Sequence, residues 1–207
     1  MRRPACWGER PAVMGVVNLT PDSFSDGGRF NRLDLALKEV SRQVSAGADV
    51  LDIGAQSTRP GAVEVGAEEE LRRLLPSLRA IRSAHPELII SVDTFLAPVA
   101  EAALEAGADW INDVSGGRRD PAMIPLVAEA GCPYVLMHSR GDSSTMDACT
   151  DYGSQGVVAG VLDELRVSTD RAFAAGLRQE QLIWDPGRGC AKANAQNLER
   201  WGRGEEL

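Results

Sequence analysis

The chain has 207 residues, of which 43% are hydrophobic and 25% charged, and its formal net charge is −8. These values suit one globular domain with a sizeable core and argue against a disordered chain. The negative charge opposes non-specific binding to nucleic acid or anionic lipid, although a locally basic pocket could still hold a phosphate. No apolar segment reaches the length needed to cross a bilayer.

Neither the first dozen residues nor the cysteines point to secretion. Residues 1–12 carry three arginines but lack the apolar run of a secretory signal. The four cysteines form no C-x-x-C pair, and only His85 and His138 could join them in a zinc site. We therefore expect free thiols and a cytoplasmic protein.

Six short apolar runs rich in valine and isoleucine alternate with longer amphipathic stretches. In chain order they span residues 13–19, 50–54, 88–92, 110–114, 134–137 and 182–184. Nearly continuous apolar runs of this length are typical of buried parallel strands. The alternation predicts repeated βα units in a single α/β domain.

The intervening segments have helical spacing. One apolar stripe runs from Leu71 to Ile81 and another from Val157 to Leu165, and we expect both to cover the sheet. Pro76 lies inside the first stripe, so it should kink that helix or mark its boundary. The tetrapeptide Ala-Gly-Ala-Asp occurs at 46–49 and again at 106–109, where its glycine is expected to end a helix.

Two architectures fit this pattern: a (β/α) barrel and a doubly wound sheet. No G-x-G-x-x-G sequence follows the first strand, which removes the main signal of a dinucleotide-binding sheet. Polar clusters follow every predicted strand, as in a barrel whose active face gathers the βα loops. We therefore predict a barrel.

Two polar loops follow the first two predicted strands. Residues 18–28 read N-L-T-P-D-S-F-S-D-G-G, and residues 52–61 read D-I-G-A-Q-S-T-R-P-G. The first could close over a ligand, and the arginine of the second suits phosphate oxygens. An ordinary surface turn and a capped loop with an exposed arginine would give the same two patterns.

Carboxylate or carboxamide side chains end three further predicted strands. Asp93, Asn112 and Asp185 would converge in a barrel, where they could bind the flat edge of a heterocycle that carries an amidine-like group. Any one of them could instead cap the next helix. His138 also ends a strand, and we expect a hydrogen-bonded structural residue there rather than an acid or base.

Together these motifs resemble the dihydropteroate synthase family. The resemblance rests on N-L-T-P-D-S-F-S-D-G-G, S-T-R-P-G, S-V-D-T, N-D-V-S-G-G and D-P-G-x-G-x-x-K, in that order, between residues 13 and 199. It implies a pterin-binding barrel at 13–199, after an N-terminal extension at 1–12 and before an atypical tail at 200–207. It also implies that 6-hydroxymethyl-dihydropterin diphosphate and para-aminobenzoate are joined, with Mg²⁺ at the diphosphate.

The resemblance also assigns roles to individual positions. Asn18 would contact the metal, and Thr58 and Arg59 would serve the diphosphate and aminobenzoate side. Pterin-binding and other substrate-binding positions are Asp93, Asn112, Met137, Asp185, Phe24 and Lys192, and the catalytic set is Arg59, Asp93 and Asp185. Catalysis in the family relies on positioning and electrostatics, without a covalent enzyme intermediate.

The sequence departs from the family pattern in two respects. Arg188 and Cys190 stand where the family usually has apolar and aromatic residues, which affects the expected wall of the aminobenzoate site. About six βα units are present, whereas a complete barrel has eight and typically about 250 residues. We expect a truncated chain that is inactive or weak alone, and that forms a homodimer or needs a partner to complete the barrel.

Two alternatives stay open at this point. Methyltetrahydrofolate-dependent methyltransferases resemble this family in the barrel and in the pterin-reading Asp and Asn positions, although the two polar loops favour the synthase. The other alternative is a remnant that binds pterin, or pairs with another subunit, without turnover.

Overall fold

The computed structural model describes residues 1–20, 29–57, 64–141, 145, 148–188 and 191–203. Its strands are β1 (Met14–Asn18), β2 (Val50–Gly54), β3 (Ile89–Asp93), β4 (Trp110–Asp113), β5 (Tyr134–Met137) and β6 (Leu182–Asp185). Its α-helices are α1 (Arg29–Ser45), α2 (Ala67–Ala84), α3 (Ala97–Glu105), α4 (Met123–Ala130), α5 (Gly156–Ala174) and α6 (Asn194–Gly202). Short 3₁₀ turns, η3 (Gly153–Gln155) and η4 (Gln179–Gln181), precede α5 and β6.

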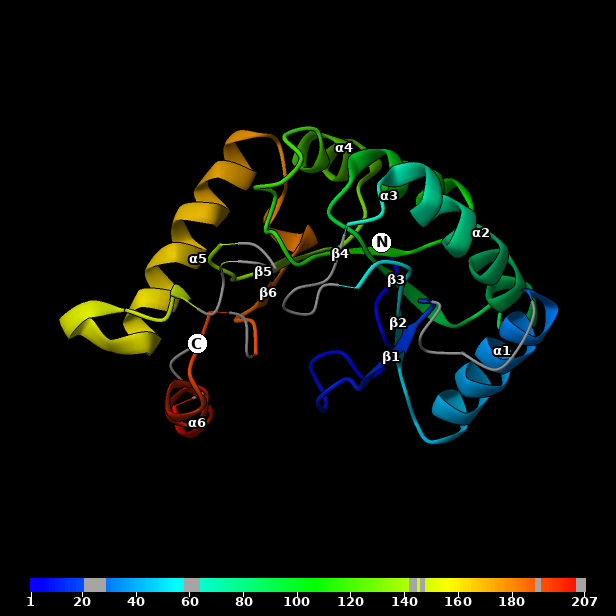
Figure 1. The fold of residues 1–207 in the computed structure, drawn as a ribbon, viewed down its shortest axis with the longest axis horizontal. Coiled ribbons are helices and arrows are strands. Elements are labelled where there is room, and N and C mark those ends of the chain that lie inside the picture. The colour runs from blue at the N-terminus through cyan, green and yellow to red at the C-terminus, as the bar shows by residue number, and fades with distance from the viewer. Residues whose placement is uncertain (21–28, 58–63, 142–144, 146–147, 189–190, 204–207) are drawn as a thin grey trace.

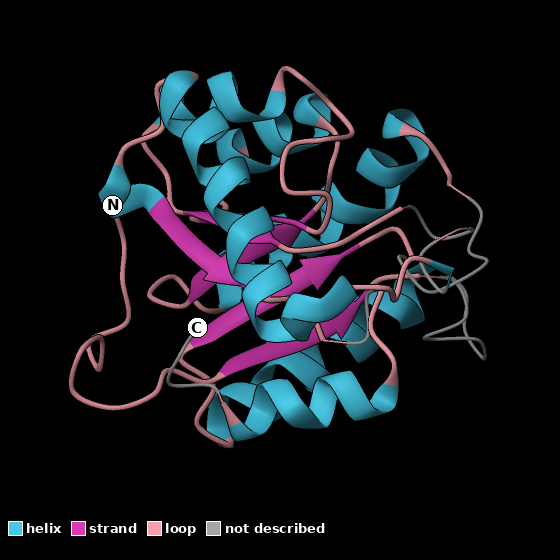
Figure 2. Cartoon of the chain, turned by 90° about the vertical axis from the view of Figure 1, so that its left-hand side faces the viewer, coloured by secondary structure: helices cyan, strands magenta, loops and turns pink. Residues whose placement is uncertain are grey.

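The six strands form one parallel sheet in the order β1-β2-β3-β4-β5-β6. Strands that are consecutive in sequence are therefore neighbours in space, which is barrel topology and not the doubly wound order. Figure 1 shows helices α1 to α5 as an arc outside the sheet, which opens between α1 and α6. Figure 2 shows the strands from the side, with helices packed along them. Within the described residues β1 and β6 are the sheet edges, and the predicted incomplete barrel of six βα units is confirmed.

Alternation along each strand divides the apolar residues into two groups. Outward-facing residues such as Leu51, Ile90 and Ile111 are fully buried against the helices and form the main core. Inward-facing residues form a second, smaller cluster, the barrel floor, which contains Val50, Ile89, Trp110, Val135 and Ile183. Because side chains alternate with a period of two, the residue two positions after each floor residue faces the barrel interior as well.

The repeated Ala-Gly-Ala-Asp tetrapeptides end α1 and α3 as expected. Gly47 and Gly107 have φ angles of 98° and 105°, which glycine adopts without a Cβ penalty. In both copies the aspartate then reaches the preceding strand region: Asp49 accepts the Val13 N–H at 2.9 Å, and Asp109 accepts the Ile90 N–H at 3.0 Å. The repeated sequence thus closes each helix and also joins it to the sheet.

Helix α2 runs through Pro76 without interruption, so this residue marks no boundary. Proline lacks an N–H and crowds the carbonyl one turn earlier, which normally breaks a helix. Here Leu74 and Leu78, one on each side of the proline, are fully buried against the sheet. This packing outweighs the local cost of the proline.

The N-terminal extension packs beneath the barrel floor. The indole N–H of Trp110 donates to the Arg2 carbonyl at 2.9 Å, and Trp7 meets Trp110 edge to face with ring centroids 5.9 Å apart. Residues 1–12 therefore cover the amino-terminal ends of the strands. In the part of the chain that the structure describes, no helix is both long and apolar enough to span a membrane.

Candidate functional site

A layer of mostly polar side chains lies directly above the apolar floor. Each member follows a floor residue by two positions, which puts Asp52, Ser91, Asn112, Met137 and Asp185 on the inner face. Strand register sets Asp93 opposite Asn112 and Met137 opposite Asp185. The three strand-end residues predicted to bind a heterocycle are thus brought to one end of the sheet.

Asp52 and Asp93 are held within this layer by close contacts. Asn112 donates its amide N–H to Oδ2 of Asp52 at 3.0 Å across the sheet. A Cβ built on Gly54 would lie 3.3 Å from both Cβ and Oδ2 of Asp93, so the glycine provides the space for that carboxyl group. The network therefore joins β2, β3 and β4.

Several acceptor atoms in the layer are buried without a protein donor. Within the described residues, Oδ1 of Asp52, Oδ1 of Asp93 and Oδ1 of Asn112 have no hydrogen-bond partner. Buried polar atoms are nearly always paired, and leaving one unpaired costs about 1 to 3 kcal/mol. Three unpaired acceptors side by side indicate a site for a ligand that supplies N–H or O–H donors.

Burial also changes the protonation of the two aspartates. Loss of solvent raises the pKa of Asp52, and the nearby Asp185 charge adds to the rise, although the neighbouring polar side chains of Ser91 and Asn112 oppose it. Burial raises the pKa of Asp93 well above its usual value, and the charges of Asp52, Glu70 and Asp113 act in the same direction. Carboxyl groups with raised pKa values are common at catalytic and binding sites.

Glu70 stands behind this cluster on α2. Its side chain is 1% exposed, and its Oε1 has no hydrogen-bond partner in the described structure. Burial raises its pKa to about 7, although a hydrogen bond from Thr94 and the charge of Arg73 favour the ionised form. Glu70 therefore adds a second titrating carboxyl group next to Asp93.

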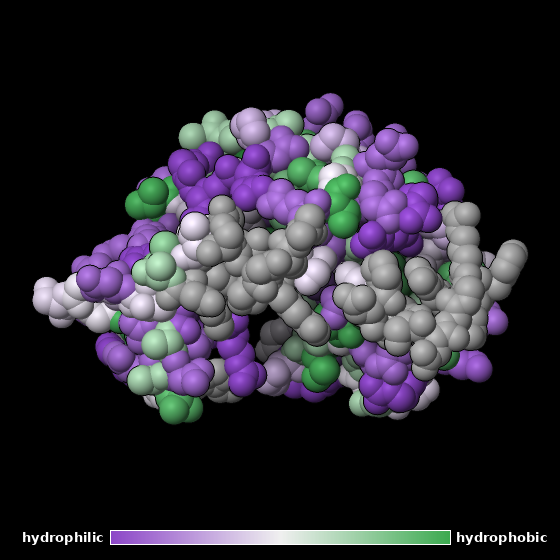
Figure 3. Space-filling view, viewed as in Figure 1, coloured by the Kyte–Doolittle hydropathy of each residue, from purple (hydrophilic) through white to green (hydrophobic). Residues whose placement is uncertain are grey.

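An open hollow of about 510 Å³ lies along the inner face toward the edge of the sheet. It is lined by floor residues, by Trp7 from the N-terminal extension and by Asp185 and Pro186. The space-filling view shows a depression at the lower centre of the molecule, near the opening of the arc (Figure 3). Asp185, a member of the polar layer, thus also lines an accessible space.

Asn18 occupies the carboxyl end of edge strand β1. Its side chain is exposed and contributes to a hollow of about 490 Å³ between β1 and α1. No group of three or more His, Cys, Asp or Glu side chains suited to a metal occurs in the described residues. A metal at Asn18 would therefore need most of its ligands from a substrate and water, which is the usual coordination of Mg²⁺ with phosphates.

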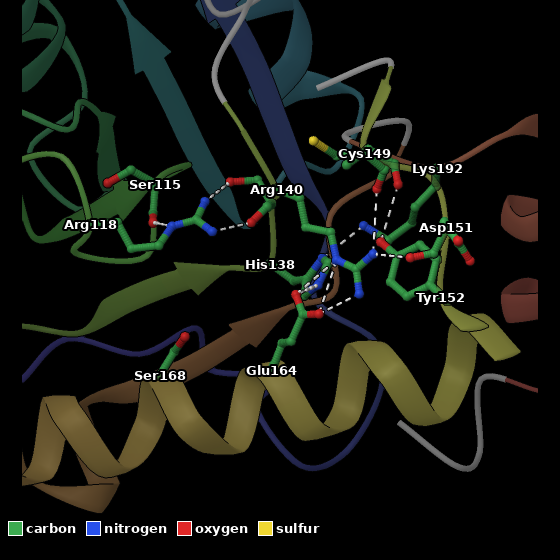
Figure 4. A network of polar contacts seen from close by, with 12 residues as sticks. Ser115, Arg118, His138, Arg140, Cys149, Asp151, Tyr152, Glu164, Ser168 and Lys192 are labelled. Carbon is green, nitrogen blue, oxygen red and sulfur yellow. Dashed lines mark hydrogen bonds and ion pairs between the residues drawn. The ribbon is translucent and has the colours of Figure 1, made fainter. Parts of the chain in front are cut away.

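His138 and Lys192 belong to a separate network on the outer side of β5. The Lys192 ammonium lies 2.9 Å from His138 Nδ1, and Glu164 on α5 lies 2.9 Å from His138 Nε2 (Figure 4). Both ring nitrogens therefore have partners, as expected for a hydrogen-bonded structural histidine. Lys192 is buried beside this ring, and no described contact joins it to the polar layer, so its predicted substrate role stays a prediction.

Some of the predicted site lies outside the described residues. This applies to Phe24, Thr58, Arg59 and Cys190. Asp52 and Ser91 were not assigned a role from the sequence, although both stand in the quoted motifs and both follow a floor residue by two positions. That spacing is the signal that could have found them.

Comparison of the chain with known proteins identifies its family. The family model for pterin binding enzyme matches residues 14–205. The chain belongs to the pterin-binding enzyme family. The match to this family extends past Glu199, where the resemblance in motifs ended, and α6 likewise continues to Gly202 with Arg200 buried.

Relatives that the chain matches include dihydropteroate synthases. The chain is 45% identical to the enzyme of Synechocystis over 192 residues, which is 93% of this chain and 65% of that protein. A structure of the Xanthomonas albilineans enzyme with 4-aminobenzoic acid shares 42% identity and a TM-score of 0.84, covering 97% of this chain and 71% of that one. A Burkholderia cenocepacia enzyme complexed with 7,8-dihydropteroate shares 38% identity and a TM-score of 0.82, covering 96% and 66%. The chain thus spans about two thirds of the length of these relatives.

Proposed function

We propose that the polar layer binds the pterin ring of 6-hydroxymethyl-7,8-dihydropterin diphosphate, and that the site serves dihydropteroate synthase chemistry. The observation that carries this proposal is the set of three buried, unpaired oxygens on Asp52, Asp93 and Asn112. An aminopyrimidine edge presents adjacent N–H donors in one plane, which is what these acceptors lack. The relatives that bind aminobenzoate and dihydropteroate support the same assignment.

The reaction replaces a C–O bond with a C–N bond. The bond between the pterin methylene and diphosphate breaks, the arylamine nitrogen of para-aminobenzoate attacks the methylene carbon, and the amine loses a proton. Positive character develops on the pterin methylene as diphosphate leaves. We propose that the carboxyl groups of Asp93 and Asp185 stabilise that charge, and that positioning supplies the rest of the acceleration.

Binding of the diphosphate is the other half of the proposal. Arg59 and Thr58 are proposed to bind its oxygens because a planar guanidinium matches phosphate geometry. Asn18 is proposed as a protein ligand of Mg²⁺, which neutralises charge on the leaving diphosphate when it is bound. Its exposed carboxamide, free of hydrogen bonds to the described residues, fits that role.

The open sheet edges favour a second subunit. Val16 on edge strand β1 is 55% exposed, and Met14 beside it is 37% exposed. Strand edges and apolar side chains of this kind are normally covered in a folded protein. We propose that a second copy or another chain completes the barrel wall there, and that the 207-residue chain alone binds pterin with little or no turnover. Its cytoplasmic location stays a prediction.

The decisive experiment combines calorimetry with a product assay on the purified chain. Titration with 6-hydroxymethyl-dihydropterin diphosphate and Mg²⁺ should give saturable binding that Asp93→Ala removes. Exposed Glu101→Ala on α3 serves as the control and should bind like the wild type. No saturable heat with the wild-type chain contradicts the proposed pterin site, and rapid dihydropteroate formation contradicts binding without turnover.

A further inference from the structure

The segment that follows Asp185 is clamped against the end of β5. The His138 N–H donates to the Asp185 carbonyl at 2.7 Å, and the Gly187 N–H donates to Oδ1 of Asp185 at 2.8 Å. A Cβ on Gly187 would lie only 2.1 Å from the His138 carbonyl oxygen, so the two backbones touch. The orientation of the Asp185 carboxylate therefore depends on where Gly187 sits.

Side-chain contacts also hold Ala191 and Lys192, which come later in the chain. The Tyr152 hydroxyl donates to the Ala191 carbonyl at 3.1 Å, and the next residue, Lys192, directs its ammonium to His138. Ala191 has a φ of 55°, and it alone among the described non-glycine residues has a left-handed backbone. Such a conformation costs about 1 kcal/mol or more and persists only where the surroundings enforce it.

The hydrogen bonds define which nitrogen of the His138 ring carries the proton. An ammonium group can only donate, so Nδ1 of His138 accepts from Lys192 and carries no proton. The remaining ring proton is then on Nε2 and is donated to the Glu164 carboxylate. Glu164 in turn accepts from Arg140, whose guanidinium lies 3.7 Å from the Tyr152 ring centroid. Figure 4 shows this chain of contacts from Lys192 to Tyr152.

We propose that His138, Glu164 and Lys192 are positioning residues that fix the backbone at Asp185, Gly187 and Ala191 and thereby aim the Asp185 carboxylate into the pterin site. Within the described residues their side-chain hydrogen bonds do not reach the side chains of the polar layer, whereas the backbone N–H of His138 meets the Asp185 carbonyl, so they act through the backbone of Asp185, Gly187 and Ala191. The effect on ligand binding rests on the proposed pterin site. The proposed restraint of the backbone by His138, Glu164 and Lys192 does not depend on that site. In this arrangement Lys192 serves as an internal donor.

The structural part is tested by histidine ¹⁵N spectroscopy on the full chain. The chain has two histidines, so His85 gives a reference signal and a His85→Gln variant assigns it. We expect the His138 signals of a neutral ring with its proton on Nε2, and Lys192→Met should shift the Nδ1 signal strongly. The exposed Lys38→Met is the control and should shift neither ring. A proton on Nδ1, or a spectrum unchanged by Lys192→Met, overturns the inference.

The positioning role is tested by amide exchange and by ligand affinity. Lys192→Met should accelerate amide exchange at Gly187 and Ala191 by about tenfold and weaken binding of the pterin diphosphate by about tenfold to a hundredfold, since small displacements of a binding group have effects of this size. Lys192→Arg, which keeps a donor, should recover most of both losses. Exchange that stays at the wild-type rate refutes the positioning role, whether or not ligand binds. If Lys192→Met accelerates exchange but the wild-type chain binds no ligand, the proposed pterin site is contradicted and the structural role of Lys192 is retained.

Discussion

The polar layer inside the barrel and the His138 network outside it both contain buried ionisable side chains, but they differ in whether the buried polar atoms have hydrogen-bond partners. Asp52, Asp93 and Asn112 leave acceptor oxygens without donors, whereas both ring nitrogens of His138 are bonded. A buried group without a partner destabilises the free protein, and a paired group does not. The difference indicates that the inner layer is preorganised for a ligand and the outer network for holding the backbone.

The largest expected effect is on ligand affinity when the inner layer is changed. Asp93→Ala should weaken binding of the pterin diphosphate by about a thousandfold, because truncating a buried charged partner costs about 2 to 5 kcal/mol. Thermal unfolding of the ligand-free chain should change little or shift to higher temperature, since the variant removes an unpaired buried carboxyl group. Calorimetry and a melting curve measure both, and a strongly destabilised variant with wild-type affinity contradicts the distinction.

The next effect is a loss of stability at acid pH caused by the outer network. Burial, followed by the Lys192 charge, lowers the pKa of His138 from 6.5 to about 4. As the pH falls, the unfolded chain therefore takes up this proton before the folded chain does. The free energy of unfolding that neutral His138 contributes is present above pH 6.5 and is lost as the pH falls toward 4. The loss should be about 3 kcal/mol. Urea unfolding between pH 7 and 4 measures it, and His138→Gln should flatten the slope.

Glu70 should show the opposite dependence because its pKa is raised. The folded state holds the proton more tightly, so the corresponding stability is present below pH 4.5 and is lost as pH rises through about 7. Glu70→Gln cannot ionise, and we expect it to raise stability by about 3 kcal/mol at pH 8 with little change at pH 4. Equal effects at the two pH values would show that Glu70 is not a titrating group.

The smallest effect tests the hydrogen bond between the Tyr152 hydroxyl and the Ala191 carbonyl. Tyr152→Phe keeps the ring beneath Arg140 but removes the hydroxyl that donates to Ala191. We expect a loss of about 1 kcal/mol in unfolding free energy, the usual size for one hydrogen bond. Because the Lys192–His138 contact remains, the histidine spectrum should be unchanged. A large spectral change would place Tyr152 inside the network rather than at its end.

Much of the architecture could be predicted from local patterns. All six apolar runs became strands, and two of them, Val50–Gly54 and Tyr134–Met137, have the predicted bounds. The boundary allowed at Pro76 did not occur, because burial of Leu74 and Leu78 outweighed the local preference of proline. Local preferences are weak compared with tertiary packing, which is why the helix continues through that position.

The candidate site could be predicted in part. Asp93, Asn112 and Asp185 were found because polar residues end buried strands, and the structure gathers them at one end of the sheet. Asp52 was missed because it lies inside β2, where a carboxyl group is acceptable only next to a partner such as Asn112 on another strand. Lys192 is predicted to bind substrate because its motif ends there, and that role stays a prediction; the sequence does not show that His138 contacts it from the outer side of β5.

The sequence by itself determined the repeated βα units and the helix-ending glycines, because these follow from local backbone preferences. Only the tertiary structure decided which polar groups are paired. Partners such as Asp52 and Asn112, or His138 and Lys192, are far apart in the chain and meet through strand register and helix packing. The protonation of these side chains and their hydrogen bonds depend on such long-range contacts, since burial and neighbouring charges set the pKa values.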